Sequence, residues 1–442
     1  MSKKENNNTL VKNATFLMVA ALISKIIGML YKSPLTTLIG RESFACFQFA
    51  QNAYFILLMI ASFSIPQAVS KIMSERIAFK RYRDAQRVFK GALLYAVIAG
   101  GIAALICIFG ASILVPDNMA NARLALQMLA PTIFVSGILG VFRGYFQAYR
   151  NMLPTSISQI LEQIAVATVA LLASGFMVSH FANAGEDTLQ RWSAAGATMG
   201  TGAGVCTAFL FMLFVYKVNH KTIAKKIKND RVSVDESYRS IMKIILLIAA
   251  PIILSAFIYN VNGYINGVMY TSILGWRGVS NSLVKQNYAE YGFFMTLINI
   301  PLTLASTAPT SMMPEVSAQY AIGDLEETKR KIDQATWIAM LISIPASVGL
   351  AVLAQPVTRL IFPSTEGVAG QLMMIGVITV ILNSTSNISN GVLQAIGKAN
   401  IPMINAAIAL GVDVVFLALM LVFTNMGIYA VVLAMVVYAL VM

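Results

Sequence analysis

Two lysines, Lys25 and Lys32, lie inside the first long apolar stretch of the chain, at residues 15–39. At 1.5 Å per residue this stretch is long enough to cross a bilayer core of about 30 Å. A charge at the bilayer centre costs about 2.5–3.5 kcal/mol even on scales from insertion experiments, so both lysines indicate a water-filled cavity or an anionic partner. Their spacing places them on one helix face, two turns apart. The alternative is that Lys32 extends to the membrane interface and only Lys25 is buried.

A cationic cavity would suit a substrate that carries phosphates, and other polar residues in apolar segments are candidates to line it. Glu162 lies in the polar run SQILEQ, where it either pairs with Lys25 or Lys32 or joins a neighbouring helix near the cytoplasmic interface. Arg41 follows the first apolar stretch and is expected at its outer end. It lies at the membrane interface or at the mouth of the cavity.

Amides form a second group of candidates. Asn262 and Asn266, close to Asn260, lie one turn apart in a later apolar segment, where they line the cavity or form hydrogen bonds between helices. Gln51 and Asn52 form a similar polar patch in the second apolar segment. Amide side chains of this kind can bind the hydroxyl groups of a sugar.

Asp413 is the one carboxylate in the middle of the apolar segment 402–424. A buried carboxylate either becomes protonated or finds a cation. Coupling to Na⁺ or H⁺ and a salt bridge to a basic residue are the two interpretations. No other cofactor and no metal site are expected.

The composition defines the class of protein that presents these residues. The chain has 442 residues, 12% charged residues and a mean hydropathy of +0.72, whereas soluble domains carry about 25% charged residues. We therefore expect an all-α polytopic membrane protein. Twelve apolar segments mark the expected helices, at residues 14–38, 44–70, 90–115, 123–147, 154–180, 193–216, 240–272, 288–318, 333–354, 368–396, 402–424 and 427–442.

Basic residues set the expected orientation. With the N-terminus in the cytoplasm, the cytoplasmic connections hold 24 of the 32 lysines and arginines, as the positive-inside rule requires. The net charge of +13 is thus a consequence of membrane topology and does not indicate nucleic acid. The same loops can contact anionic lipid headgroups. The chain ends abruptly after its last apolar segment, and we expect a longer natural protein with 14 helices.

An internal repeat divides the chain. The string GYFQA at residues 144–148 recurs as GVLQA at 391–395, and Pro66 recurs as Pro314, at offsets of 247 and 248. Repeats of six helices have the same orientation and are related by a pseudo-twofold axis along the membrane normal. We expect an N-terminal lobe at residues 1–216, a basic cytoplasmic linker at 217–239 and a C-terminal lobe at 240–442, with transport by rocking of the lobes.

Enzyme chemistry has no support in the sequence. The string GVLQAIGKA at residues 391–399 lacks the spacing and the Ser/Thr of a phosphate-binding loop. The two histidines, His180 and His220, form no hydrolase or metalloprotease motif. We therefore predict a transporter, expected to be a monomer, and not an enzyme.

Five motifs carry a resemblance to a known family: SKIIG at residues 24–28, PQAVSK at 66–71, RGYFQ at 143–147, PTSISQILEQ at 154–163 and MPEVS at 313–317. Together they resemble the MOP superfamily of exporters, in particular its stage V sporulation protein B-like subgroup of polysaccharide and lipid II flippases. The resemblance covers the chain from about residue 12 to its end. It implies a bacterial plasma-membrane protein of two six-helix lobes with two further C-terminal helices.

The resemblance also implies a substrate and a role for Lys25. Members of the family move undecaprenyl-pyrophosphate-linked sugar precursors from the inner to the outer leaflet, using basic residues of the first helix in a cationic cavity. The alternative is a cation-coupled multidrug antiporter of the related MATE type, although a cavity with two lysines is a poor host for cationic drugs. A third class is a scaffold of cell-wall synthesis that does not transport.

Overall fold

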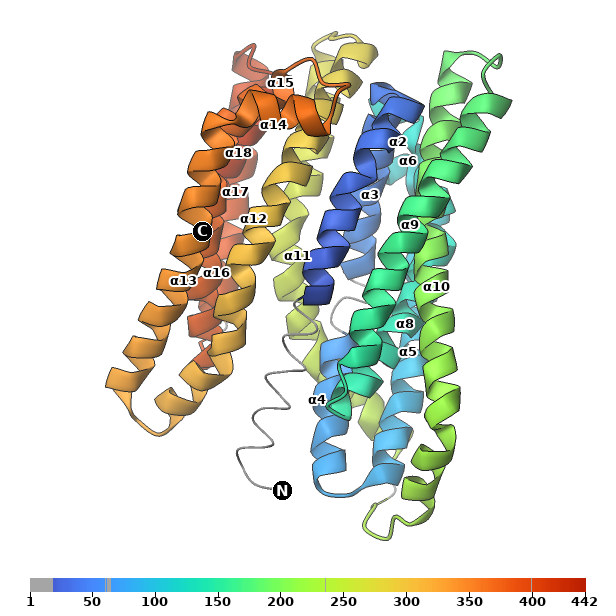
Figure 1. Ribbon diagram of the computed structural model, residues 1–442, viewed down its shortest axis with the longest axis vertical. Coiled ribbons are helices and arrows are strands. Elements are labelled where there is room, and N and C mark those ends of the chain that lie inside the picture. Colours follow the sequence, from blue (N-terminus) through green and yellow to red (C-terminus); the bar gives the residue numbers. More distant parts are fainter. Residues whose placement is uncertain (1–18, 60, 62–64, 235, 399) are drawn as a thin grey trace. The chain divides into compact units, whose positions relative to one another are not determined.

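The computed structural model describes residues 19–59, 61, 65–234, 236–398 and 400–442. Residues 19–30 are helical and precede a series of helices without a strand among the described residues (Figure 1). The helices are α2 (Lys32–Ile39), α3 (Arg41–Leu58), α4 (Ile65–Ala78), α5 (Tyr82–Phe109), α6 (Ala111–Leu114), η2 (Asp117–Met119), α7 (Ala122–Met128), α8 (Ala130–Ala148), α9 (Leu153–His180), α10 (Glu186–Lys228), α11 (Tyr238–Trp276), α12 (Asn281–Ala321), α13 (Leu325–Val352), α14 (Ala354–Ile361), α15 (Val368–Gly376), α16 (Ile378–Ala395), α17 (Asn400–Phe423) and α18 (Ile428–Val441).

Local sequence explains several helix ends. Pro154 lies in the first turn of α9, where its missing N–H leaves no hydrogen bond unmade. Between α12 and α13 the chain turns at Gly323, which has a φ of +81°. The next residue, Asp324, caps α13 by accepting a hydrogen bond from the Glu327 N–H.

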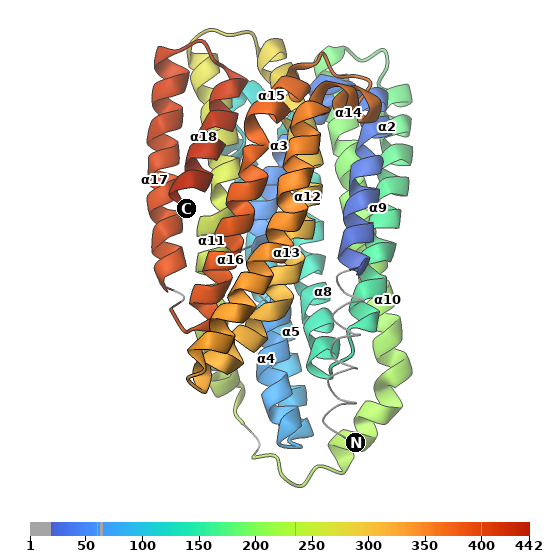
Figure 2. The same cartoon turned by 60° about the vertical axis from the view of Figure 1, so that its left-hand side comes forward.

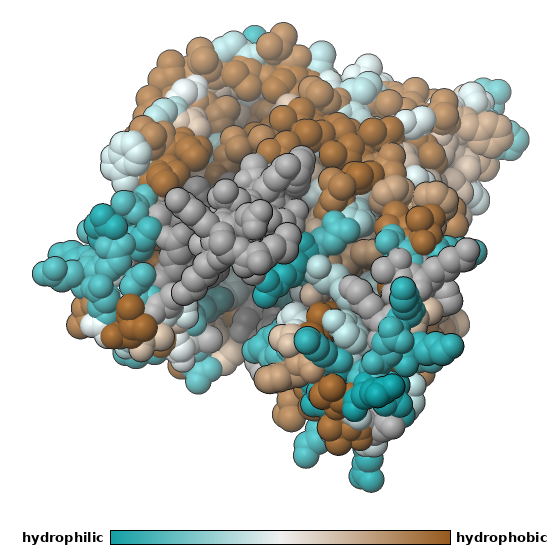
Figure 3. Space-filling model, turned by 60° about the horizontal axis from the view of Figure 1, so that its bottom comes forward, coloured by the Kyte–Doolittle hydropathy of each residue, from teal (hydrophilic) through white to brown (hydrophobic). Residues whose placement is uncertain are grey.

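Six helical segments in the described residues are long and apolar enough to cross a membrane, or seven if α15 and α16, bent by 43°, count as one span. The chain is therefore a multi-pass membrane protein, and the total of twelve spans stays a prediction. Two predicted segments are interrupted. The first is divided by a turn at Tyr31, between the helix of residues 19–30 and α2, and residues 368–396 bend between α15 and α16. In Figure 3 hydrophilic side chains gather at the end turned toward the viewer, and hydrophobic side chains cover the surface farther back.

The chain forms two compact units. Unit 1 comprises the described parts of Met1–Tyr31, Ala50–Val115 and Asn121–Phe257, and unit 2 those of Lys32–Phe49, Pro116–Ala120 and Ile258–Met442. The unit boundaries fall within α3 and α11, and α10 continues as a helix to Lys228 through part of the segment expected as a linker. The lobe boundaries at 217–239 stay a prediction.

Aromatic side chains fill the core of each unit. In unit 1, Phe89 of α5 packs on Tyr145 of α8, with ring centroids 4.7 Å apart, and on Tyr216 of α10. In unit 2, Phe293 of α12 stacks on Phe362 at 4.5 Å. Figure 2 shows α12, α13 and α16 of unit 2 side by side. Interlocked rings of this size exclude water and hold the helices that carry the polar residues.

Candidate substrate and ion-binding sites

Lys25 lies on the helix of residues 19–30 in unit 1, and its side chain is exposed. This helix closely approaches α9, because a Cβ atom at Gly28 would lie 3.3 Å from Gln163 Oε1. Ser24 Oγ, one residue before Lys25, is buried without a hydrogen-bond partner among the described residues. The small residue at position 28 therefore places the helix of Lys25 beside the polar run of α9.

Glu162 of α9 has its partner on α8. Its Oε2 accepts a hydrogen bond from Arg143 Nη2 at 2.6 Å, and Arg143 Nε also donates to Ser158 Oγ at 3.1 Å. Both charged side chains are about one-fifth exposed. Of the two interpretations from the sequence, the contacts of the described residues show the one with a neighbouring helix, and a pair with Lys25 or Lys32 stays a prediction. This ion pair joins two motif strings of the chain.

The polar patch of the second apolar segment continues inside unit 1. Gln51 Nε2 donates to Thr201 Oγ1 of α10 at 2.7 Å, and Tyr54 Oη lies 3.4 Å from Ser136 Oγ of α8. Asn52 is half-buried beside Gln51. These contacts link α3 to two other helices through neutral groups.

Lys32 begins α2 in unit 2 and is half-buried. Its Nζ donates to Thr296 Oγ1 of α12 at 3.3 Å. Asn262 of α11 is half-buried in the same unit. The unit boundary follows Tyr31, so the shared helix face of Lys25 and Lys32 stays a prediction.

Arg41, at the start of α3, is held by two carboxylates of unit 2. It pairs with Glu366, and its Nη1 lies 3.6 Å from Oε1 of Glu290. Glu290 is buried in α12 and accepts hydrogen bonds from Thr365 Oγ1 and from the N–H groups of Glu366 and Ala369. The hydrogen bond and charge of Arg41 hold the pKa of Glu366, in the loop before α15, below its usual value. Arg41 thus fastens this loop to α12.

Asp413 and Asn266 form a buried polar pair in unit 2. Asp413 of α17 has no exposed surface and Asn266 of α11 is 1% exposed. Asn266 Nδ2 donates to Asp413 Oδ1 at 3.4 Å, whereas Asp413 Oδ2 and Asn266 Oδ1 accept no hydrogen bond from a described residue. The second interpretation from the sequence was a salt bridge from Asp413 to a basic residue. The contacts of the described residues include no such salt bridge. Two buried oxygens without donors suit a hard cation or a proton.

The predicted site residues are divided between the two units. Unit 1 holds Lys25, Gln51, Asn52 and Glu162, and unit 2 holds Lys32, Arg41, Asn262, Asn266 and Asp413. Their membership in one cavity stays a prediction.

Comparison with known proteins places this geometry in a family. The profile of the polysaccharide biosynthesis protein family matches residues 10–319, which is more than half of the chain. The chain belongs to this family. The MatE profile also matches residues 278–419.

Two curated relatives of this family member come from Bacillus subtilis (strain 168). Lipid II flippase MurJ is 23% identical over 427 residues, covering 92% of this chain and 77% of the relative. Stage V sporulation protein B is 25% identical over 411 residues, covering 90% and 75%. The resemblance to this subgroup of the MOP superfamily is thereby confirmed.

Solved structures show the same fold. A multidrug resistance MATE family transporter of the MOP superfamily in an inward-facing conformation superposes with a TM-score of 0.73 at 16% identity, covering 96% of this chain and 91% of the other. A MOP superfamily transporter from Pyrococcus furiosus gives 0.66 at 17% identity, covering 97% and 92%. The prediction of an all-α, MATE-like two-lobe fold is confirmed, while the pseudo-twofold axis stays a prediction.

Sequence reasoning did not single out Glu290 or Thr296. Glu290 is a carboxylate in the predicted segment 288–318, and that position alone was a signal for a buried partner. Thr296 carried no signal, because a lone threonine in an apolar helix usually bonds to its own helix. Arg143 belonged to a motif, but its pairing with Glu162 required the packing of α8 on α9.

Proposed function

We propose that this protein is a flippase that moves an undecaprenyl-pyrophosphate-linked sugar precursor, lipid II or a related cell-wall glycan, from the inner to the outer leaflet. Transport would proceed by alternating access through a cationic cavity. The observation that carries the proposal is the exposed Lys25 in the string SKIIG, on a helix that contacts the motif residue Gln163. The curated names of the relatives, a lipid II flippase and a sporulation protein, support the same substrate class.

The chemistry follows from charge. A pyrophosphate is a dense anion, and its oxygens form strong charge-assisted hydrogen bonds with an ammonium group. Lys25 would bind it, with Lys32 as a further cation, while Gln51, Asn52 and Asn262 would bind sugar hydroxyls. Arg41 already balances Glu366 and Glu290, and Asn266 already donates to Asp413. Glu162 would act through Arg143, whose charge it balances. The proposal includes no enzymatic step.

The setting of the proposal is a bacterial plasma membrane, with the N-terminus in the cytoplasm and the basic loops near anionic headgroups. The protein would act as a monomer. Asp413 and Asn266 would couple transport to Na⁺ or H⁺, supported by their two buried oxygens without donors.

The proposal is tested by replacement of function. Cells depleted of their own lipid II flippase would express the full chain, and lipid II in the outer leaflet would be measured. We expect rescue, and a loss of at least about tenfold with Lys25→Ala, since a charged hydrogen bond contributes about 1.5–3 kcal/mol. Lys90→Ala, which removes an exposed lysine elsewhere in unit 1, is the matched control. Full rescue by Lys25→Glu would refute the cationic site.

A cation-coupled multidrug antiporter is the second candidate. It is favoured by the MatE match over residues 278–419 and by the buried Asp413, which lies within that range and accepts a hydrogen bond from Asn266 outside it. This candidate predicts that Lys25→Glu retains or improves export of a cationic drug while flipping of a pyrophosphate lipid is lost. Drug export measured in the same variants separates the two functions.

A further inference from the structure

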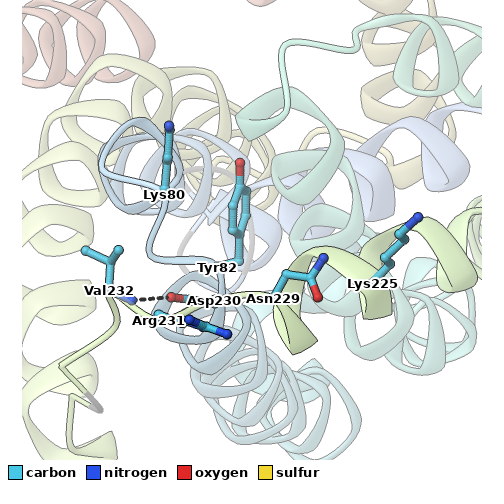
Figure 4. Close-up of a pocket in the computed structure, with 7 residues that line it drawn as sticks. All are labelled: Lys80, Tyr82, Lys225, Asn229, Asp230, Arg231 and Val232. Atoms are coloured by element: carbon cyan, nitrogen blue, oxygen red, sulfur yellow. Dashed lines mark hydrogen bonds between the residues drawn. The ribbon is translucent and has the colours of Figure 1, made fainter.

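A basic pocket lies in unit 1 between the turn that joins α4 to α5 and the end of α10. It has a volume of about 430 Å³ and is lined by Lys80, Tyr82, Lys225, Asn229, Asp230, Arg231 and Val232 (Figure 4). This volume is in the range of small-molecule sites and exceeds the needs of a single ion. None of these residues belongs to the predicted transport site.

The walls of the pocket are fixed by Asp230. Its Oδ2 accepts hydrogen bonds from the Arg83 N–H at 2.7 Å and from Ser233 Oγ at 2.6 Å, and its Oδ1 accepts from the Val232 N–H at 2.9 Å and the Ser233 N–H at 3.1 Å. Burial raises the pKa of Asp230, but these hydrogen bonds outweigh it and hold the pKa below its usual value. The carboxylate is therefore ionised at neutral pH and engaged on both oxygens.

A second carboxylate, that of Asp84, also holds the segment that follows α10. Asp84 of α5 accepts hydrogen bonds from the N–H groups of Val234 and Glu236, at 3.0 and 3.1 Å. The segment after α10 is thus tied to the start of α5 at two points, Asp230 and Asp84. The pocket between them is formed before any ligand binds.

The carboxylates of this region already have basic partners outside the pocket. Glu236 pairs with Arg76 and Arg81, and Asp84 also pairs with Arg81. Within the described residues, no ion pair engages the three pocket cations. Lys80, Lys225 and Arg231 are all exposed. The lining therefore holds three cations against the single carboxylate of Asp230, and this excess positive charge attracts an anion from outside the chain.

The depth of the pocket relative to the bilayer narrows the choice of anion. The 28 residues of α5 extend for about 42 Å, close to the 40–45 Å of a bilayer with its headgroups. Tyr82, the first residue of α5, precedes by about 12 Å the apolar segment that begins at residue 90, so the pocket lies at the water-facing edge of the headgroups. An arginine fork and two ammonium groups are the usual partners of phosphate.

We propose that this pocket binds a phosphate group at the inner membrane surface, carried by an anionic phospholipid or by a soluble phosphate compound. The site goes beyond the proposed transport activity, and a flippase or an antiporter would carry it equally. Binding in a defined pocket depends on where the basic residues lie, whereas diffuse attraction to basic loops depends only on their total charge.

The test uses the full chain with two triple variants of equal charge. Lys80→Gln/Lys225→Gln/Arg231→Gln changes the pocket, and Lys71→Gln/Lys90→Gln/Lys398→Gln removes three exposed lysines elsewhere. Native mass spectrometry from nanodiscs of phosphatidylglycerol and phosphatidylcholine measures the lipid retained. Thermal unfolding in detergent, titrated with inorganic phosphate against chloride at constant ionic strength, measures binding of the free anion. Lys225→Gln alone, with Lys225→Arg as its conservative partner, serves if the pocket triple does not fold.

Retention of phosphatidylglycerol that falls at least about fivefold in the pocket variant and not in the control supports a lipid phosphate. A saturable phosphate shift lost in the pocket variant alone, without a preference for phosphatidylglycerol, supports a soluble phosphate. Equal losses in both triple variants, or unchanged binding in the pocket variant, would overturn the proposal. Because neither readout requires transport, a negative result here leaves the flippase proposal untouched.

Discussion

At the scale of single residues, Asp413 and Asn266 give a sharp prediction. If their two oxygens without donors bind Na⁺, then Na⁺ should raise the thermal unfolding temperature of the purified protein relative to K⁺ at equal ionic strength. Asp413→Asn removes the negative charge with almost no change of shape and should abolish this shift. If the pair binds H⁺ instead, Asp413→Asn should abolish the pH dependence of transport.

Lys25→Ala is the matched control for Asp413→Asn. Because Lys25 lies in unit 1, this variant should keep the Na⁺ response although it loses flipping. An Asp413→Asn protein with an unchanged Na⁺ shift and an unchanged pH dependence would place the pair among structural contacts.

Residue types were predictable, but residue partners were not. Charges inside apolar segments identified Lys25, Glu162 and Asp413, because burial of a charge is costly in any membrane fold. The partner of Glu162, Arg143, depended on the packing of α8 against α9, which no local pattern encodes. The exposed pocket around Arg231 was also missed, because its loop residues resemble any solvated basic segment.

At the scale of elements, the same close contact recurs in both units. A Cβ atom at Gly144 of α8 would lie 2.7 Å from Pro66 O and 3.0 Å from Pro66 Cα, at the start of α4. In unit 2 a Cβ atom at Gly391 of α16 would lie 3.1 Å from Met313 Sδ of α12. The sequence repeat aligns Gly144 with Gly391 and Pro66 with Pro314, which follows Met313 in the chain. Aligned glycines thus make a close helix contact in each unit, with backbone in unit 1 and with a side chain in unit 2.

Gly144→Ala should destabilise the protein by about 1–3 kcal/mol, because the added methyl group meets rigid backbone of α4. Gly391→Ala should cost less, since the methionine side chain can move. Gly101→Ala in α5 is the control: no atom lies within 4 Å of its Cβ position, and alanine favours the helix. Thermal unfolding in detergent ranks the three variants. Equal stability of Gly144→Ala and Gly101→Ala would contradict this account of the contact.

At the scale of the whole molecule, apolar segments and motif strings were sufficient to predict the fold class and the family. The helix breaks were harder to predict. The bend of 43° between α15 and α16 has no proline at Val377, whereas the turn at Tyr31 is followed by Pro34, which has no N–H to donate to the carbonyl of Leu30. Hydrophobicity reports the length of a span but not where its hydrogen-bond ladder changes direction, which packing decides.

The distribution of charge over the whole chain makes a final prediction, on orientation. Phe79 before α5 and Ile322 after α12 lie in turns beside basic segments, whereas Asn183 lies between α9 and α10, and all three are exposed. In a background in which Cys46, Cys107 and Cys206 are replaced, single cysteines at these positions would be treated with a membrane-impermeant thiol reagent. With the N-terminus in the cytoplasm, Asn183→Cys should react in intact cells, and Phe79→Cys and Ile322→Cys only after the membrane is opened. The reverse pattern would invert the topology and would move the basic pocket to the outer surface, where a phospholipid of the inner leaflet could not reach it.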